Sequence, residues 1–291
     1  MDQPVAVVII HGMGAQEPDY AKDIIDKLYK LVPKQLGDEQ DAQLVVKAVY
    51  WADITHEKEE EVWQRVTASG EMDRLDLRRF IFNLAGDTLA YQPSEGRKEL
   101  YLGVHRKIAE TLGELSAEAG PEAPLCVVAH SLGTVVAQNY LYDLQHGSDK
   151  AEELPDAETS LERGETLSLL CTYGSPIAIW RLRFGDEYKA IDFPGGSTEE
   201  MYPSLQAKWY NIYDGDDVLG YPISQLTDHY EGLAKEGYLE DLTSDAGGLL
   251  MGWNPMSHKT YLHDDGELER LAGFIADIWH GANAEQPENI A

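Results

Sequence analysis

Short apolar runs alternate with segments of helical periodicity along most of this 291-residue chain. Residues 5–10 (VAVVII) form an unbroken apolar run, which is typical of a parallel strand that is covered on both faces. Further strands are expected at residues 44–51, 125–129, 167–173 and 207–213. The pattern also predicts helices at residues 20–31, 98–117, 134–144 and 266–279. Strands that alternate with helices indicate an α/β fold, with a mostly parallel, open sheet of about six strands and helices on both faces.

The alternation stops between residues 52 and 95, where two helical stretches follow each other with no strand pattern between them. We interpret this segment as a helical insertion that could form a cap over one end of the sheet. Residues 181–204 match no pattern and are a second candidate for a lid. The length favours a single domain over residues 1–291, and residues 281–291 are expected to form a polar tail.

The chain is strongly acidic, with 52 Asp and Glu against 23 Lys and Arg and a net charge of -29. Such a charge disfavours nucleic acids and anionic membrane surfaces as partners. The apolar runs are shorter than the roughly 20 residues of a membrane span, so no stable membrane insertion is expected. The first run lacks the basic flank of a signal peptide, and we expect a cytoplasmic protein. The two cysteines, Cys126 and Cys171, lie in strand patterns and are expected to be reduced core thiols.

Four short motifs directly follow the expected strands, at the edge where open parallel sheets carry their chemistry. They are HGMG (11–14), AHSLG (129–133), YGSP (173–176) and YDGDD (213–217). In AHSLG, Ser131 stands between a strand and a helix, with the small residues Ala129 and Gly133 two positions away on either side. This is a variant of the G-x-S-x-G nucleophile elbow, so Ser131 is the candidate nucleophile. A helix cap is the simpler alternative for this serine.

Backbone amides near Ser131 are candidates for holding a developing oxyanion. The amide of Leu132 lies at a helix N-terminus, and the amide of Met13 belongs to the glycine-rich loop after the first strand. His11, in the same loop, is expected to have a structural role. Ser175 precedes Pro176, which has no amide to donate, so Ser175 is expected to be a turn residue that lines the cleft.

Taken together, these motifs resemble those of the α/β-hydrolase superfamily. More narrowly, the chain is similar to bacterial lipase- and esterase-like hydrolases that carry an HGMG strand end, an AHSLG elbow and a GSP turn. The resemblance is strongest at residues 5–17, 124–142, 168–177, 208–220 and 254–262, and it is absent from 52–95. It implies an α/β-hydrolase fold and a catalytic triad in the chain order serine, acid, histidine.

The resemblance places the acid after the strand at 207–213, where YDGDDVLGYP offers three aspartates. The family pattern, Asp-x-Val with a proline a few residues on, favours Asp216. Asp217 and Asp214 remain alternatives.

For the base, the family's last motif matches SHKTYL and points to His258, with His263 as the alternative. A histidine suits this role because its ordinary pKa lies near neutrality, and an aspartate can fix its tautomer.

The activity implied is the hydrolysis of carboxylic esters, of esterase or lipase type, through an acyl-enzyme on Ser131. The expected substrate is a small-molecule ester or a lipid. No cofactor and no metal are expected, because the chain has no HExxH motif, no CxxC pair and no GxGxxG after the first strand. A thioesterase, an amidase or an acyltransferase on the same triad stays open, as does a non-catalytic binding protein of this fold. The sequence favours no particular oligomeric state or acyl chain length.

Overall fold

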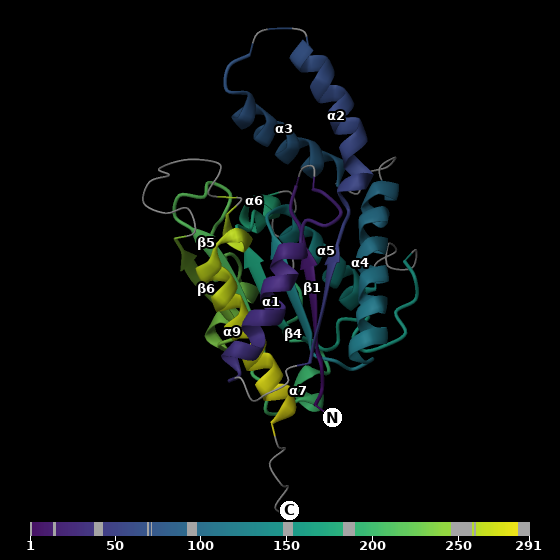
Figure 1. The fold of residues 1–291 in the computed structure, drawn as a ribbon, viewed down its shortest axis with the longest axis vertical. Coiled ribbons are helices and arrows are strands. Elements are labelled where there is room, and N and C mark those ends of the chain that lie inside the picture. The colour runs from purple at the N-terminus through teal and green to yellow at the C-terminus, as the bar shows by residue number, and fades with distance from the viewer. Residues whose placement is uncertain are drawn as a thin grey trace, which may run out of the picture.

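The computed structural model describes residues 2–13, 16–37, 43–68, 70, 72–91, 98–147, 154–182, 190–245, 258 and 260–284. Within these residues the core is a six-stranded sheet in the order β2-β1-β3-β4-β5-β6, in which every neighbouring pair is parallel (Figure 1). The strands are β1 (Val5–Ile10), β2 (Leu44–Val49), β3 (Leu125–His130), β4 (Leu167–Tyr173), β5 (Lys208–Asp214) and β6 (Leu239–Ser244). The predicted α/β fold, with a parallel sheet between helices, is confirmed.

Two pairs of helices cover the two faces of this sheet (Figure 1). On one face, α1 (Lys22–Gln35) packs against α9 (Asp265–Asn283), and on the other, α4 (Lys98–Ala119) packs against α5 (Leu132–His146). The crossover through α1 and the crossover through α5 run in opposite directions along the sheet. Because parallel crossovers are right-handed, these two helices must lie on opposite faces. The remaining helical elements are α2 (Ala52–Ala68), α3 (Leu75–Ala90), α6 (Ile177–Arg181), α7 (Thr198–Met201), α8 (Asp228–Lys235) and the 3-10 turn η4 (Tyr261–His263).

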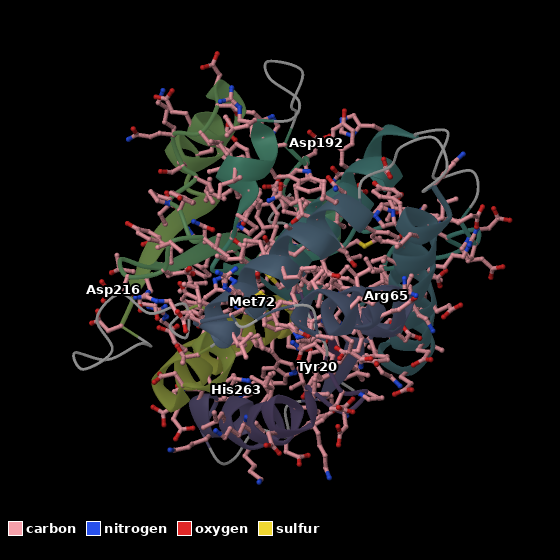
Figure 2. The ribbon with its side chains drawn as sticks, turned by 90° about the horizontal axis from the view of Figure 1, so that it is seen from above. Tyr20, Arg65, Met72, Asp192, Asp216 and His263 are labelled. Carbon is pink, nitrogen blue, oxygen red and sulfur yellow. The ribbon has the colours of Figure 1, made fainter. Side chains whose placement is uncertain are left out.

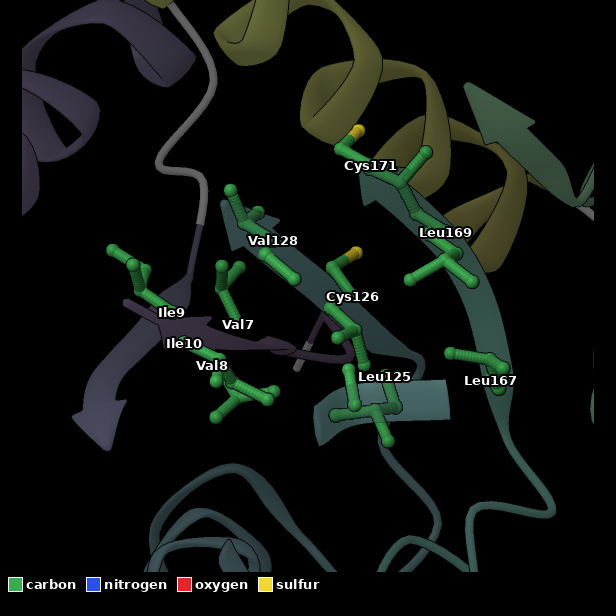
Figure 3. Close-up of a cluster of buried hydrophobic side chains, with 14 of the residues drawn as sticks. Val7, Val8, Ile9, Ile10, Leu125, Cys126, Val128, Leu167, Leu169 and Cys171 are labelled. Carbon is green, nitrogen blue, oxygen red and sulfur yellow. The ribbon is translucent and has the colours of Figure 1, made fainter. Parts of the chain in front are cut away.

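The centre of the sheet is apolar on both sides, which explains the unbroken hydrophobic runs in the sequence. All residues of β1 and β4 are buried, and Figure 3 shows their side chains packed with those of β3. Cys126 and Cys171 are both buried free thiols in this core, as expected, and burial raises the pKa of each well above its ordinary value.

The strand order reverses between β1 and β3, and this reversal locates the site. From β1 the chain moves outward to β2, and it then returns to the other side of β1 to form β3. In open α/β sheets, ligands bind beyond the carboxyl ends of the strands at such a switch point. HGMG follows β1 and AHSLG includes the end of β3, so both motifs lie at this point.

The two helical stretches expected between residues 52 and 95 are α2 and α3, which pack on each other. The Trp63 and Phe82 rings lie 5.3 Å apart, and the Arg79 guanidinium stands 5.0 Å from the Trp63 ring. Both helices lie beyond the carboxyl ends of the strands (Figure 1), and Met72, between them, lies near the middle of the end-on view in Figure 2. The role of this pair as a cap stays a prediction.

Residues 190–204 of the second lid candidate lie at the opposite end of the molecule, whereas Arg181 and Leu182 end the short helix α6 after β4. Gly195 N donates to Leu167 O at the start of β4 (2.9 Å), and α7 lies beside the amino ends of the strands (Figure 1). Residues 190–204 therefore do not cover the carboxyl edge of the sheet, and 183–189 lie outside the described residues.

Among the differences from the sequence-based expectation are an additional edge strand and a longer last helix. The segment LEDLTS forms β6, an edge strand whose polar residues hid it from a search for apolar runs. Helix α9 continues to Asn283, whose amide pairs with the main chain of Gln3 (2.6 and 3.1 Å). Residues 281–283 of the expected tail are thus helical, and 285–291 lie outside the described residues. Among the described helices, none has both the length and the apolar composition that crossing a membrane requires.

Candidate active site

Ser131 occupies a strained backbone position between β3 and α5. Its φ is 55° and its ψ is -130°, a conformation that costs a non-glycine residue about 1–3 kcal/mol. The neighbouring strand holds it there, because Ser131 N donates to Tyr173 O (2.9 Å). Thr134 donates to Ser131 O through its amide (2.9 Å) and its hydroxyl (2.7 Å). The Ser131 side chain accepts no capping hydrogen bond from α5, all of whose residues are described, so the helix-cap alternative is wrong.

Two glycines let the loops after β1 and β3 touch. A Cβ on Gly133 would lie 2.6 Å from Ile10 O, and a Cβ on Gly12 would lie 2.6 Å from Ser131 Cβ. The β1–β3 register leads to the contact of Gly12 with Ser131, since the paired residues Ile10 and Ala129 each lie two positions before one of them. The two expected amide donors directly follow the contacting residues: Met13 follows Gly12, and Leu132 follows Ser131.

A buried histidine connects Ser131 to a carboxylate. His258 Nε2 lies 2.6 Å from Ser131 Oγ, and His258 Nδ1 lies 2.8 Å from Asp217 Oδ2. All three residues are at most 5 % exposed. The carboxylate accepts a hydrogen bond from Nδ1–H, which leaves the Nε2 lone pair facing the serine hydroxyl.

The acid in contact with His258 is Asp217, which was an alternative, and not Asp216, which the family pattern favoured. Asp217 N donates to Asp214 O (3.1 Å), and this turn brings the Asp217 side chain back over the sheet. Asp216 is exposed at the periphery (Figure 2), and its amide donates to Asp214 Oδ1 (2.8 Å). Asp214 thus organises the turn. The alternative base His263 is exposed at the end of η4, while His258 makes the contact with Ser131.

Asp217 is held in its charged form. Burial raises the pKa of its carboxyl group, but hydrogen bonds from His258, from Leu219 N and from Tyr261 outweigh this effect and lower the pKa below its ordinary value. Leu219 N binds Oδ1 (2.9 Å), while His258 and Tyr261 both bind Oδ2. A carboxylate so placed fixes the tautomer of His258, with the ring proton on Nδ1.

The histidine beside the nucleophile, His130, anchors the segment that carries His258. Its Nε2 donates to His258 O over 2.6 Å. Burial, with a smaller contribution from His258, lowers the pKa of His130 to about 3, so the ring is neutral near pH 7. The sequence places His130 next to Ser131 but offers no signal for this contact with residue 258.

His11 supports the loop after β1 and has the structural contacts expected of it. Its ring stacks on Trp51 at 4.8 Å, its Nδ1 donates to Gly12 O (2.6 Å), and its Nε2 accepts from Trp51 N (3.2 Å). Burial lowers the pKa of His11 to about 4, so this ring is also neutral near pH 7.

Ser175 differs from the expectation that it lines the cleft. It is fully buried, and its Oγ lies 2.8 Å from Thr134 Oγ1, so it ties the turn after β4 to the first turn of α5.

Sequence reasoning missed two further residues of the site, Gly174 and Tyr261. Gly174 has a φ of +54°, and a Cβ there would lie 2.8 Å from both Asp217 Oδ2 and Tyr261 Cε2. The glycine of YGSP and the tyrosine of SHKTYL were visible signals, although neither motif alone predicts that they meet.

Within the described part of the chain, no group of three or more His, Cys, Asp and Glu side chains could hold a metal ion. No protein-family model and no curated protein matches the chain. Its chemistry is therefore inferred from the geometry of the site: a hydroxyl, an imidazole and a carboxylate in series are suited to proton transfer coupled to nucleophilic attack.

Proposed function

We propose that the protein is a serine hydrolase of the α/β-hydrolase type, which cleaves carboxylic esters through an acyl-enzyme on Ser131. The observation that carries this proposal is the buried series of hydrogen bonds from Ser131 Oγ through His258 to Asp217, with distances of 2.6 and 2.8 Å. Structural serines seldom sit at positive φ with the hydroxyl on a histidine that is itself bonded to a carboxylate, and this combination is the geometric signature of an activated nucleophile.

The chain order of the three groups supports membership of this superfamily. Ser131 follows β3, Asp217 follows β5 and His258 follows β6, which is the order serine, acid, histidine. Their loops meet at the carboxyl edge of the sheet, beside the switch point between β1 and β3.

In the first half of the reaction, Ser131 Oγ attacks the ester carbonyl carbon while His258 Nε2 takes the hydroxyl proton. The carbonyl oxygen becomes an oxyanion, for which the amides of Leu132 and Met13 are the proposed donors. A donor of this kind is worth about 2.7–4 kcal/mol in the transition state. His258 then gives its proton to the leaving alkoxide oxygen, the alcohol departs, and the acyl group remains on Oγ.

In the second half, a water molecule attacks the acyl-enzyme and gives its proton to His258 Nε2. The tetrahedral intermediate collapses, His258 returns the proton to Ser131 Oγ, and the carboxylic acid leaves. Asp217 stays ionised throughout, because the pKa of its carboxyl group is lowered. Its negative charge stabilises the imidazolium form of His258 during the reaction.

The strong negative charge narrows the substrate class. At a net charge of -29, long-range repulsion disfavours polyanionic substrates and favours neutral or cationic esters. We therefore propose an uncharged small-molecule ester or lipid ester as the substrate.

A substrate panel tests this function. p-Nitrophenyl esters of graded chain length, matched thioesters and matched anilides are given to the wild type and to Ser131→Ala. We expect kcat/KM to be higher for the esters than for the thioesters and the anilides. We also expect Ser131→Ala to lose the turnover of the esters. A preference for thioesters or anilides would assign a different acyl chemistry to the same site, and equal turnover by Ser131→Ala would reject the proposal.

A further inference from the structure

Tyr261 is a fully buried tyrosine that lies three residues after His258 and contacts the same carboxylate. Its hydroxyl donates to Asp217 Oδ2 over 2.9 Å. The same oxygen accepts a hydrogen bond from His258 Nδ1 over 2.8 Å. Two side chains of one short segment therefore converge on one oxygen atom.

The direction of the tyrosine hydrogen bond is fixed by a second contact. Asp214 N donates to Tyr261 Oη over 2.8 Å. A phenol has a single hydrogen, and a backbone amide can only donate. The Tyr261 hydroxyl must therefore accept from Asp214 and direct its own hydrogen at Asp217.

The surroundings leave the Asp217 carboxylate little freedom to rotate. Its other oxygen, Oδ1, accepts from Leu219 N at 2.9 Å. Two glycines border Oδ2 on the remaining sides, since a Cβ on Gly174 or Gly220 would lie 2.8 or 3.0 Å from it. The carboxylate is thus fixed by three donors, one of which is the phenol.

We propose that Tyr261 is a positioning residue, whose hydroxyl orients the Asp217 carboxylate towards His258 and so keeps the imidazole aligned with Ser131. This inference rests on the proposed serine hydrolase function. It adds a fourth side chain, outside the triad, on which the rate of proton transfer depends.

Loss of the hydroxyl has a specific physical consequence. In Tyr261→Phe, His258 is the donor that Asp217 Oδ2 keeps among the described residues, and Asp214 N loses its hydrogen bond to the Tyr261 oxygen. Because one of the bonds that lower the pKa of Asp217 is gone, that pKa rises. The chemical step slows, whereas substrate affinity is unchanged, since Tyr261 acts through Asp217.

The experiment compares Tyr261→Phe with Tyr230→Phe. Tyr230 is a matched control, because it is fully buried and its hydroxyl also donates to a buried side chain, Gln138 Oε1 (2.9 Å), and not to the Asp217 carboxylate. We expect kcat to fall roughly tenfold in Tyr261→Phe, as for the loss of one hydrogen bond to a charged group, with KM within about twofold. Tyr230→Phe should keep the wild-type kcat. Equal kcat in the two variants would overturn the proposal.

A second readout does not depend on turnover. The titration of the Asp217 carboxyl carbon, followed by ¹³C NMR, should move to higher pH in Tyr261→Phe and stay in place in Tyr230→Phe. If Ser131 proves inactive towards every ester, the proposed function fails, while an unshifted carboxyl titration separately rejects the role of Tyr261.

If Tyr261→Phe does not fold, a measurement on the wild type decides. A slowly exchanging Tyr261 hydroxyl proton coupled to the Asp217 carboxyl supports the contact, and a freely exchanging one contradicts it.

Discussion

Gly12 and Ser131 approach each other so closely that a Cβ atom on Gly12 would lie 2.6 Å from the Cβ of Ser131. The same atom would lie 3.2 Å from Ser131 Oγ and 3.0 Å from His130 O. A glycine in the first loop is therefore a requirement of the elbow in the second, although the two residues are far apart in the sequence.

Gly12→Ala should displace either the elbow or the loop that carries Met13. Because a displacement of about 1 Å at a catalytic group costs roughly 100-fold in rate, we expect kcat/KM for an activated ester to fall by about that factor. Gly113→Ala is the control, since a Cβ there meets no atom within 4 Å, and this helical position should gain about 0.5–1 kcal/mol in stability. Wild-type kinetics in Gly12→Ala would mean that the two loops separate during turnover.

Asp217 and Asp216 are neighbours in the chain with very different surroundings, and they provide a matched pair of variants. Asp217→Asn replaces the acceptor of the His258 Nδ1 proton with a group that disfavours the required tautomer. We expect kcat to fall by roughly 10⁴. Asp216→Asn changes an exposed side chain and should alter kcat by no more than about twofold. The opposite ranking, measured with one ester at saturating concentration, would restore Asp216 as the acid.

The stability of the fold should fall on mild acidification because His130 is buried in its neutral form. Its pKa is about 3 in the folded protein and 6.5 in the unfolded chain, so between these values only the unfolded state binds a proton there. The contribution of His130 to the free energy of unfolding is therefore fully present above pH 6.5 and is lost as the pH falls towards 3. The loss from pH 7 to pH 5 should be about 2 kcal/mol for this residue.

Urea unfolding at pH 7 and pH 5 measures this contribution in His130→Gln, which removes the titrating ring and keeps an amide donor near His258 O. The difference in unfolding free energy between the two pH values should shrink by about 2 kcal/mol relative to the wild type. His280→Gln, at an exposed position on α9, should leave the difference unchanged. An unchanged difference in His130→Gln would show that the ring is solvated or charged in the folded protein.

Much of the fold follows from hydrophobic patterning, and the exceptions have physical causes. The strands β1, β3 and β4 are buried on both faces, so their sequences are continuous apolar runs. These runs predicted the first and last residues of the three strands to within one residue. Among the described strands, β6 borders only β5, and an edge position tolerates the polar residues of LEDLTS. Its pattern carried too little hydrophobic signal to be recognised.

The site was predictable to the level of its segments and less so to the level of single residues. Ser131 stands in an elbow whose small neighbours reflect a backbone constraint, and His258 was indicated by the resemblance of SHKTYL to a family motif. The choice between Asp216 and Asp217 depends on which way one tight turn points its side chains, and a hydrophobic pattern does not encode that direction. The contacts of His130 and Tyr261 join loops that are distant in sequence, so only the folded structure could reveal them.

The most direct test of the account is labelling by a fluorophosphonate, in which the Ser131 oxygen attacks phosphorus, fluoride leaves and His258 takes the proton. Mass spectrometry of the intact protein and of its peptides should find one adduct, on Ser131. Labelling should be absent in Ser131→Ala and slower by on the order of 10³-fold or more in His258→Ala. Labelling of Ser131→Ala at the wild-type rate, or of His258→Ala as fast as the wild type, would contradict the claim that these two residues form an activated nucleophile.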